Sequence, residues 1–402
     1  TTTGGLSLVN EQATSNDNGE ASTTVQAGTV ATSVRVIAST AEVANEPASS
    51  RLVVSTGIPD QNSASLSATE LFPVAWRFDG IDSLITMRLA DAFNNPPPEG
   101  TAVSFTTSGG SIDASCTTVG EGCTVTWRSQ NPRPIPDQTF IVDEPSLSIV
   151  CPTADECRPG RVKVLATSIG NESFGDENGN GLYDGTSSAD IFNADEGTNR
   201  CTPSVPQSTQ SVGTLGCDDL GEAYLDSNFN GTRQVNGLEP FVDFNQNGQF
   251  DAGNGIYDGV LCSDTAQSAG ECTRNSVSVR DDLLLVMVCD SPLLMGDGRL
   301  PGQQSLTLGL GASGSVTMLL ADCNGNGMAP GTSVDLNTNI LENAQADTNI
   351  DGALAGSAEP TLLQVFVTAD DNDPASGVIF MNITSPTPGG SRTVTPVGIN
   401  VN

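Results

Sequence analysis

Three copies of one short pattern, D-x-N-x-N-G, lie close together in the middle of the sequence and begin at Asp176, Asp226 and Asp243. In each copy, alternate residues carry side-chain oxygens, and the glycine permits a sharp turn around one point. Calcium needs such an arrangement, because it takes about six to eight oxygen ligands at roughly 2.3–2.6 Å. The pattern is also ordinary turn chemistry, but three copies in one stretch favour calcium-binding loops.

The order of ligands in an EF-hand loop indicates which residues of each copy would bind the ion. We expect the ion to be bound by the side chains at the first, third, fifth and ninth positions and by the backbone carbonyl at the seventh. The predicted metal ligands are Asp176, Asn178, Asn180, Leu182 and Asp184 in the first copy, Asp226, Asn228, Asn230, Thr232 and Glu239 in the second, and Asp243, Asn245, Asn247, Gln249 and Asp251 in the third.

None of the three copies contains a complete EF-hand ligand set. The twelfth position of the first copy is Ser187, so Asp195 and Glu196 are candidates to complete its shell. In the second copy Gln234 replaces the ninth-position acid, and in the third Asp258, or a residue from another loop, would close the site. We therefore expect loops without flanking helices that stack on each other and share carboxylates. Few charged ligands per site predict weak binding, with a Kd of roughly 10⁻⁴–10⁻³ M.

Two further stretches carry the pattern: residues 322–327 match it in full, and residues 347–352 match it with Asp351 in place of the second asparagine. The first of them aligns with residues 91–96 in an internal repeat, and that partner lacks the ligand spacing. Residues 322–327 therefore indicate a turn. The stretch at 347–352 is left as a weaker candidate for a calcium site.

The internal repeat shows which elements position the loops. Residues 86–105 read TMRLADAFNNPPPEGTAVSF, and residues 317–336 read TMLLADCNGNGMAPGTSVDL. Each copy predicts a strand, an Asp/Asn-rich connection and another strand, so the same module occurs twice. TTTGGLSLV at residues 1–9 resembles TTSGGSIDA at residues 106–114, which indicates a third, partial copy.

These repeats, with few aromatic residues and many turn formers, predict an all-β protein of tandem sandwiches with a loop-rich calcium-binding insert. Trp76 and Trp127 are expected in the core of the complete sandwich. The predicted units are residues 1–57 as the second half of a sandwich, 58–170 as a complete sandwich, 171–275 as the calcium-loop insert, and 276–402 as another sandwich that begins with the apolar run Leu283–Val288.

The ten cysteines fall into couples that lie close in the sequence. An even number with short spacings predicts disulfides and an oxidising compartment. Pairing nearest neighbours gives Cys116 with Cys123, Cys151 with Cys157, Cys201 with Cys217, Cys262 with Cys272, and Cys289 with Cys323.

Composition excludes several functions. A net charge of −33 disfavours nucleic acid as a partner, because phosphate binding needs a positive surface. The absence of histidine excludes His-based triads and ordinary His-containing zinc sites. The sequence also contains neither a transmembrane segment nor a signal peptide.

The run from Leu84 to Phe105, which continues through SGGSIDASC and CTVTWRSQNPRP, resembles the bacterial immunoglobulin-like domains of the invasin/intimin type. The following run, from ATSIGNESFGDENGNGLYDG to DFNQNGQFDAGNGIYDG, resembles the Asp/Asn-rich insert of some surface proteins of this kind. The resemblance is strong over residues 58–260, fair over 1–57 and weaker over 276–402. It implies immunoglobulin-like sandwiches on the bacterial cell surface, and it implies no ligand, because such modules are often spacers.

We therefore expect an extracellular, non-enzymatic structural or adhesive protein that is stiffened by disulfides and calcium. Its expected partners are other cell-surface proteins or further copies of itself. If residue 1 falls in the middle of a module, a neighbouring subunit could supply the missing strands, which would make the chain a filament subunit. The alternative is a glycan-binding module or a hydrolase that uses paired carboxylates of the acidic insert.

Overall fold

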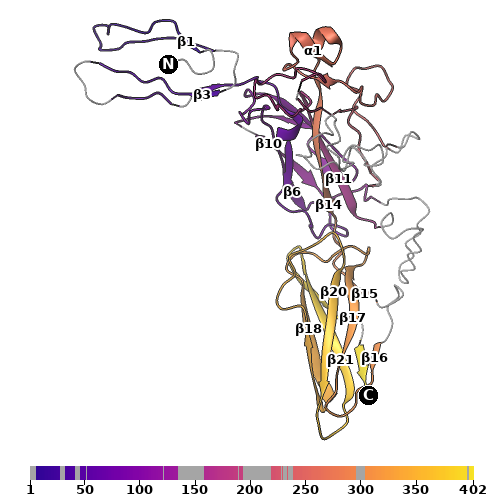
Figure 1. Ribbon diagram of the computed structural model, residues 1–402. Coiled ribbons are helices and arrows are strands. Elements are labelled where there is room, and N and C mark those ends of the chain that lie inside the picture. The colour runs from indigo at the N-terminus through magenta and orange to yellow at the C-terminus, as the bar shows by residue number, and fades with distance from the viewer. Residues whose placement is uncertain are drawn as a thin grey trace.

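The computed structural model shows two consecutive β-sandwiches, a loop-rich insert and two N-terminal ribbons (Figure 1). It describes residues 6–27, 32–40, 46–50, 52–120, 122–134, 158–188, 190–192, 219–227, 229, 233, 239–295, 304–395 and 398–402. The second sandwich continues from one end of the first, and the C-terminus lies at the opposite end of the molecule from helix α1 (Asp264–Ala269). Within the described ranges, no helix is long and apolar enough to cross a membrane.

The first sandwich consists of two four-stranded sheets. One sheet has the order β5 (Ser65–Ala68), β6 (Asp82–Arg88), β10 (Gly122–Arg128) and β8 (Ser111–Ile112), and the other β14 (Val277–Val286), β11 (Arg161–Gly170), β7 (Ala102–Thr107) and β9 (Ser115–Thr117). Alternate residues face the core, as in β6, where Ile85 and Met87 are fully buried and Leu84 is exposed. The short helix η1 (Gln61–Ser63) precedes β5.

Trp127 is the largest side chain in this core. It is fully buried, and its indole Nε1 donates a hydrogen bond to the carbonyl of Gly109 at 2.9 Å. The neighbouring Gly110 has φ of 70°, and a Cβ there would lie 2.8 Å from the indole ring. Glycine is required at this position because only it combines a positive φ with such a close approach. Trp127 is therefore a core residue, as expected, while Trp76 packs partly buried against the same core.

Strand β14 lies in the first sandwich, whereas the sequence placed this segment at the start of the C-terminal one. It pairs antiparallel with β11 over its whole length, from Val277 opposite Gly170 to Val286 opposite Arg161. Leu283 and Leu285 point into the core around Trp127. The physical reason for the difference is that an apolar run has the same pattern whichever core it fills. The insert therefore lies between two neighbouring strands of one sheet, and the first sandwich is completed only after it.

The second sandwich also has two sheets. Their orders are β15 (Pro292–Met295), β17 (Ser313–Asp322), β20 (Thr361–Ala369) and β19 (Ala344–Thr348) in one, and β16 (Gln304–Leu306), β23 (Gly398–Val401), β21 (Ser376–Thr387) and β18 (Ser333–Glu342) in the other, where β22 (Gly390–Val394) also pairs with β21. Leu320, Leu363 and Ile379 are fully buried between the sheets. The two pairs of sheets confirm the predicted all-β class of tandem sandwiches.

The internal repeat has the same local geometry in both sandwiches. Gly100 and Gly331 have φ values of 89° and 87°. The hydroxyl groups of the threonines that follow, Thr101 and Thr332, each donate to a carbonyl three residues earlier at 2.8 Å. The repeated sequence therefore encodes a repeated turn and not only two similar strands.

The N-terminal segment consists of two short ribbons. Strand β1 (Ser7–Leu8) pairs with β2 (Val25–Gln26), and β3 (Thr32–Val34) pairs with β4 (Leu52–Val54). Among the residues between 6 and 57 whose burial is described, only Leu6 is buried. This described part of the segment therefore contains paired strands without a packed core.

The described part of the insert has a small aromatic core, which the sequence did not predict. Tyr183 and Tyr257 are buried and meet Phe174 and Phe192, with ring centroids 5.0–6.0 Å apart. Strand β12 (Tyr257–Asp258) pairs with β13 (Cys272–Thr273) beside this core. Burial of aromatic rings therefore contributes to the folding of the insert alongside any bound ion.

Candidate functional site

The first predicted calcium loop folds around Asp176, whose Oδ2 accepts a hydrogen bond from the backbone N–H of Gly181 at 2.7 Å. The side-chain amides of Asn178 and Asn180 both donate to Oδ2 of Asp184, at 3.1 and 2.6 Å. The hydrogen bond from Asn180 is the largest of several that lower the pKa of Asp184. The loop therefore brings two amides against one ionised carboxylate.

The third predicted loop repeats this geometry. Oδ2 of Asp243 accepts a hydrogen bond from the backbone N–H of Gly248 at 2.8 Å. The amides of Asn245 and Asn247 both donate to Oδ2 of Asp251 at 2.6 Å. The predicted third, fifth and ninth positions thus converge in the third loop as they do in the first, while the first-position aspartate of each loop accepts backbone N–H groups.

This donor set fits a hard cation. The nitrogen and oxygen of an asparagine amide have nearly the same shape, so a half-turn of the amide exchanges them without moving the chain. A half-turn would bring two amide oxygens and one carboxylate oxygen to the same point in each loop, at the cost of the hydrogen bonds that the asparagine oxygens accept from backbone N–H groups, such as those of Leu182 and Gln249. Oxygen clusters of this kind are what calcium binds. Among the described residues, no three Asp, Glu or Cys side chains converge for metal binding, so a cation held by either loop would need oxygen ligands from the asparagines.

A fourth turn of the same kind was missed in the sequence. Asn254 donates from its amide to Oδ2 of Asp258 at 2.7 Å, and its own Oδ1 accepts the N–H of Ile256 at 2.9 Å. Oδ2 of Asp219 accepts the N–H of Gly255 at 2.9 Å, which is the role of Asp176 in the first loop. Asp258 therefore belongs to this turn and not to the third loop, which it was expected to close. The signal in the sequence is the segment GNGIYDG at residues 253–259, which repeats GNGLYDG at residues 179–185.

Buried carboxylates hold three of these turns to the body of the insert. In each turn the ninth-position aspartate donates its backbone N–H to an acidic side chain that is less than a tenth exposed. The pairs are Asp190 with Asp184 at 2.9 Å, Glu222 with Asp251 at 3.1 Å, and Glu172 with Asp258 at 2.7 Å. The sequence did not predict these acids, because no regular spacing connects them with the turns.

Glu172 is the most perturbed of these acids. Its Oε1 accepts the N–H of Leu220 at 2.6 Å, while its Oε2 accepts the N–H of Asp258. Burial, with a smaller contribution from the nearby Asp258 and Asp219, raises the pKa of Glu172 to about 9 against the two backbone hydrogen bonds that favour its ionised form. One side chain at the base of the insert therefore connects two segments that are far apart in the chain.

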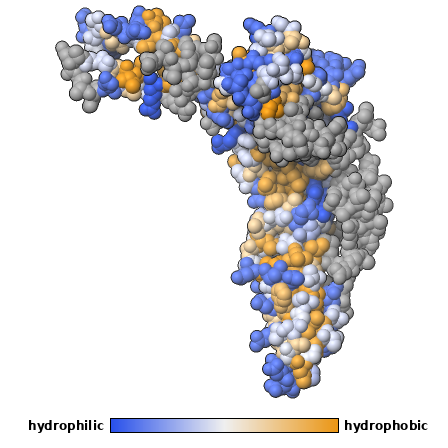
Figure 2. All heavy atoms as spheres, viewed as in Figure 1, coloured by the Kyte–Doolittle hydropathy of each residue, from blue (hydrophilic) through white to orange (hydrophobic). Residues whose placement is uncertain are grey.

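The other predicted ligands have mixed outcomes. Asp226 and Glu239 of the second loop are both 1% exposed. Leu182 lies on the first loop and donates its N–H to Oδ1 of Asn180. Gln249 lies on the third loop and donates its N–H to Oδ1 of Asn247. The remaining predicted ligands, Asp195, Glu196, Asn228, Asn230 and Thr232, lie outside the described residues. Figure 2 shows hydrophilic side chains gathered over the end of the molecule that carries the insert.

Three of the five predicted disulfides are present. They join Cys116 to Cys123, Cys262 to Cys272, and Cys289 to Cys323. The couples Cys151/Cys157 and Cys201/Cys217 lie outside the described residues. The first two disulfides close hairpin-sized loops, and the third connects the exit of β14 to the end of β17.

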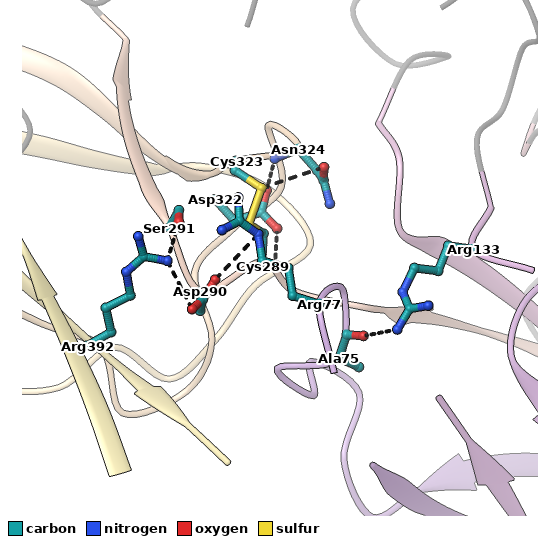
Figure 3. A network of polar contacts seen from close by, with 10 residues as sticks. All are labelled: Ala75, Arg77, Arg133, Cys289, Asp290, Ser291, Asp322, Cys323, Asn324 and Arg392. Carbon is teal, nitrogen blue, oxygen red and sulfur yellow. Dashed lines mark hydrogen bonds and ion pairs between the residues drawn. A yellow bond between two sulfur atoms is a disulfide. The ribbon is translucent and has the colours of Figure 1, made fainter. Parts of the chain in front are cut away.

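The look-alike pattern at Asp322 lies at the joint between the two sandwiches (Figure 3). Oδ1 of Asp322 accepts the N–H groups of Asn324 and Asn326, both at 2.8 Å, and Oδ2 accepts the N–H of Cys289 at 2.8 Å. Asp322 is fully buried. Its carboxylate therefore supports a turn and the adjoining linker, in agreement with the prediction of a turn here.

Ion pairs surround this joint. Asp290 in the linker contacts Arg77 of the first sandwich at 3.8 Å and Arg392 of the second at 3.1 Å (Figure 3). Arg158 and Arg161 of the first sandwich both contact Glu359 of the second, Arg161 at 2.6 Å. The two arginine side chains are mostly buried, whereas Glu359 is more than half exposed, so solvent still screens these contacts in part.

Apolar side chains from both sandwiches complete the joint. Val286 and Val288 pack with Ala329, and Phe72, Val74 and Ala358 lie against them in the same cluster. Burial, ion pairs and a disulfide therefore act together where the two sandwiches meet.

A cavity of 270 Å³ lies between the first loop and the first sandwich, with Asp60 and Asp176 in its lining. Burial raises the pKa of Asp60 to about 6. Oδ1 of Asp60 accepts hydrogen bonds from Ser173 and from the N–H of Asn62. The carboxylates of Asp60 and Asp176 both accept hydrogen bonds from nearby backbone N–H groups or side chains. This geometry therefore does not favour the alternative function of a hydrolase.

No protein-family model matches the chain, and no curated protein matches it. Among solved structures, it is similar to invasin, described as a bacterial integrin-binding protein, with 11% identity over 97% of this chain and a TM-score of 0.26. It is also similar to the Yersinia pseudotuberculosis adhesin InvE, with 10% identity over 86% of this chain and 60% of that one and a TM-score of 0.21. Domains 4 and 5 of the S-layer protein SbsC match 31% of this chain and 63% of their own at 17% identity and a TM-score of 0.18.

The chain spans about half the length of the invasin chain, 51% of which is covered. The sequence resembles domains of the invasin type, and invasin is among the similar solved structures. The class that the two pairs of sheets define is an all-β protein of tandem sandwiches with a loop-rich insert.

Proposed function

We propose that this chain is an extracellular structural protein of a bacterial surface, non-enzymatic and adhesive in role, whose acidic insert is ordered by calcium. The observation that carries the proposal is the convergence of two asparagines on one aspartate in both the first and the third loop. The joint between the sandwiches supports the structural role, because its ion pairs and disulfide hold the two units in one orientation.

The residues that would hold calcium are those that converge in the structure. In the first loop they are Asn178, Asn180 and Asp184, and in the third Asn245, Asn247 and Asp251. Calcium would supply positive charge that offsets the mutual repulsion of these oxygens, and its binding energy becomes folding energy for the insert. The chain contributes the turns, the buried acids beneath them and the aromatic core that orients them.

Calcium is expected to raise the melting temperature of the insert, and removing it with a chelator is expected to reverse the change. At about 10 mM calcium, roughly 100 times a Kd near 10⁻⁴ M, each site stabilises the folded insert by about 2.7 kcal/mol. Differential scanning calorimetry with and without chelator measures this shift. Magnesium at the same concentration is expected to do less, because it requires a near-octahedral shell.

Two paired variants make the calcium test specific. Asp184→Asn with Asp251→Asn removes the carboxylates on which the asparagines converge and is expected to abolish the calcium-dependent shift. The matched control, Asp347→Asn with Asp351→Asn, is expected to retain the shift, because Asn349 of this weaker candidate pairs with β20 through both ends of its amide and both aspartates are exposed. Melting that is indifferent to calcium in the unmodified chain would refute the proposed role of the insert.

The N-terminal ribbons support a finer proposal, assembly by strand complementation. Strands β1 and β2 pair antiparallel, as β8 and β10 do in the first sandwich. Strands β3 and β4 also pair antiparallel, as β11 and β14 do there. In the first sandwich, β10 and β11 also pair with β6 and β7, whereas β2 and β3 pair with no further strand among the described residues. Unpaired strand edges bind strands from other chains. We propose that a second copy of this chain supplies them.

Purified chains are expected to associate with increasing concentration, and amides of residues 6–57 are expected to gain protection from hydrogen exchange as they do so. Analytical ultracentrifugation and exchange mass spectrometry measure the two effects. A chain without residues 1–57 keeps both sandwiches and is the control that is expected to stay monomeric. Full chains that remain monomeric with residues 6–57 already protected would contradict assembly by this route and leave the calcium proposal intact.

A further inference from the structure

The two aspartates of the internal repeat, Asp91 and Asp322, form the same turn. Both are fully buried. In each, Oδ1 accepts the backbone N–H groups of the residues two and four places later, at 2.9 and 2.9 Å for Asp91 and at 2.8 and 2.8 Å for Asp322. The backbone N–H of each aspartate donates to the carbonyl four residues later, at 2.8 and 2.7 Å.

The second oxygen of each aspartate holds the chain that enters its sandwich from the preceding unit. Oδ2 of Asp91 accepts the backbone N–H of Thr56 at 3.0 Å, just after β4 of the N-terminal segment. Oδ2 of Asp322 accepts the backbone N–H of Cys289 at 2.8 Å, just after β14 of the first sandwich. Each sandwich therefore fastens the incoming linker with one carboxylate, and we call this arrangement the linker clasp.

The two clasps differ in one covalent bond. At the second joint Cys289, which donates to the aspartate, is bonded to Cys323, the residue after the aspartate. At the first joint the corresponding residues are Thr56 and Ala92, so the same positions carry no sulfur. The second joint is reinforced further by Arg158 and Arg161 against Glu359.

We infer that the clasp at Asp91 is the point at which the chain bends, whereas the disulfide-locked clasp at Asp322 keeps the two sandwiches aligned. A single hydrogen bond contributes only about 0.5–1.5 kcal/mol, so a clasp without a covalent bond opens by local fluctuation. The disulfide at the second joint prevents the same opening, because the linker stays attached when the hydrogen bond breaks. Flexibility is thus confined to the joint before the first sandwich.

Native-state hydrogen exchange of the unmodified full chain tests this difference directly. The amide of Thr56 is expected to exchange at least about tenfold faster than the amide of Cys289, because the two differ in how often their clasps open. Equal exchange rates at the two amides would overturn the inference. This measurement needs no variant and does not depend on the calcium proposal, because neither clasp contains a predicted ligand.

The double variant Thr56→Cys with Ala92→Cys tests the equivalence of the two joints. The introduced cysteines are expected to form a disulfide during folding, seen in mass spectrometry as the absence of new free thiols, and to slow exchange at residue 56 by about tenfold or more. Ser55→Cys with Ala92→Cys, displaced by one residue, is the matched control and is expected to keep free thiols. Free thiols in the folded Thr56→Cys/Ala92→Cys chain would show that the joints are not equivalent.

Pulsed electron spin resonance measures the bending itself. Spin labels on encoded amino acids at the exposed positions Asn16 and Val119 report the distance across the first joint without using cysteine. The distance distribution is expected to narrow in the disulfide-locked variant. An unchanged width would overturn the assignment of bending to the clasp at Asp91.

Discussion

Replacing Asp322 by alanine is expected to lower the free energy of unfolding of the C-terminal sandwich by about 3–5 kcal/mol. The substitution removes the acceptor of three backbone N–H groups, those of Cys289, Asn324 and Asn326. All three residues are buried, so their N–H groups lose the acceptor that satisfies them away from bulk solvent. Urea unfolding followed by hydrogen exchange of β20 amides measures the loss in this sandwich alone.

The control for this substitution is Asp351→Ala. Asp351 lies in the look-alike pattern at residues 347–352 and is exposed, so its removal is expected to change stability by no more than about 0.5 kcal/mol. A loss below about 1 kcal/mol in Asp322→Ala would contradict the role of this carboxylate at the joint.

The pH dependence of stability is expected to change in the same variant. Burial raises the pKa of Asp322 to about 7, against the hydrogen bonds and the nearby Arg158 that favour its ionised form. The unfolded side chain titrates near a pKa of about 3.9. Between these values the folded state holds a proton that the unfolded state has lost, so stability falls as the pH rises from about 4 to about 7.

Asp322→Ala removes this contribution, and its stability is expected to vary less over that window than the stability of the unmodified chain. Asp60 and Asp281, whose pKa values burial raises to about 6, are present in both chains and cancel in the difference. Stability curves measured by urea unfolding between pH 4 and pH 8 show the effect. A difference between the two chains that is constant across these pH values would contradict it.

Trp127→Ala is expected to lower the stability of the first sandwich by about 3–5 kcal/mol. The indole is fully buried among residues of both sheets, and its removal leaves a cavity and removes one of the two hydrogen bonds that the carbonyl of Gly109 accepts. The fluorescence of the remaining tryptophan, Trp76, reports unfolding of the same sandwich. Trp127→Phe retains much of the ring and is expected to lose less, because it removes mainly the hydrogen bond.

The effect of Trp127→Ala is expected to extend to the insert. Strands β11 and β14, between which the insert lies, contribute Val164 and Leu285 to the same core as Trp127. A core that no longer holds these strands would loosen both ends of the insert. Calcium titration of the variant is expected to show weaker stabilisation than in the unmodified chain. Equal stabilisation would show that the insert folds independently of strands β11 and β14.

Several features follow from the sequence because they depend on neighbouring residues. Alternating apolar residues and turn formers predict strands, so the all-β class and the tandem sandwiches could be derived without coordinates. The comparison of residues 86–105 with 317–336 identified the turn at Asp322 correctly, because a turn is encoded by four to six consecutive residues. Pairing by closeness in the sequence predicted the disulfides Cys116–Cys123 and Cys262–Cys272, and Cys289–Cys323, whose partners lie 34 residues apart, followed as the couple that was left over.

Other features were decided by the tertiary structure, because their partners lie far apart in the chain. Strand β14 joined the first sandwich since its apolar pattern fits either core and only pairing with β11 distinguishes them. Asp219 completes the turn at Asn254, and no local spacing connects the two.

The first and third loops also combine features that the sequence determined with features that only the tertiary structure decided. The sequence determined which residues alternate around each turn, from Asp176 and from Asp243. The structure decided that Glu172, Asp190 and Glu222 are buried beneath the turns, because burial depends on the packing of the whole insert. It also decided that a single aspartate in each sandwich fastens the linker from the unit before it, since a carboxylate and a distant backbone N–H meet only when the two units have folded against each other.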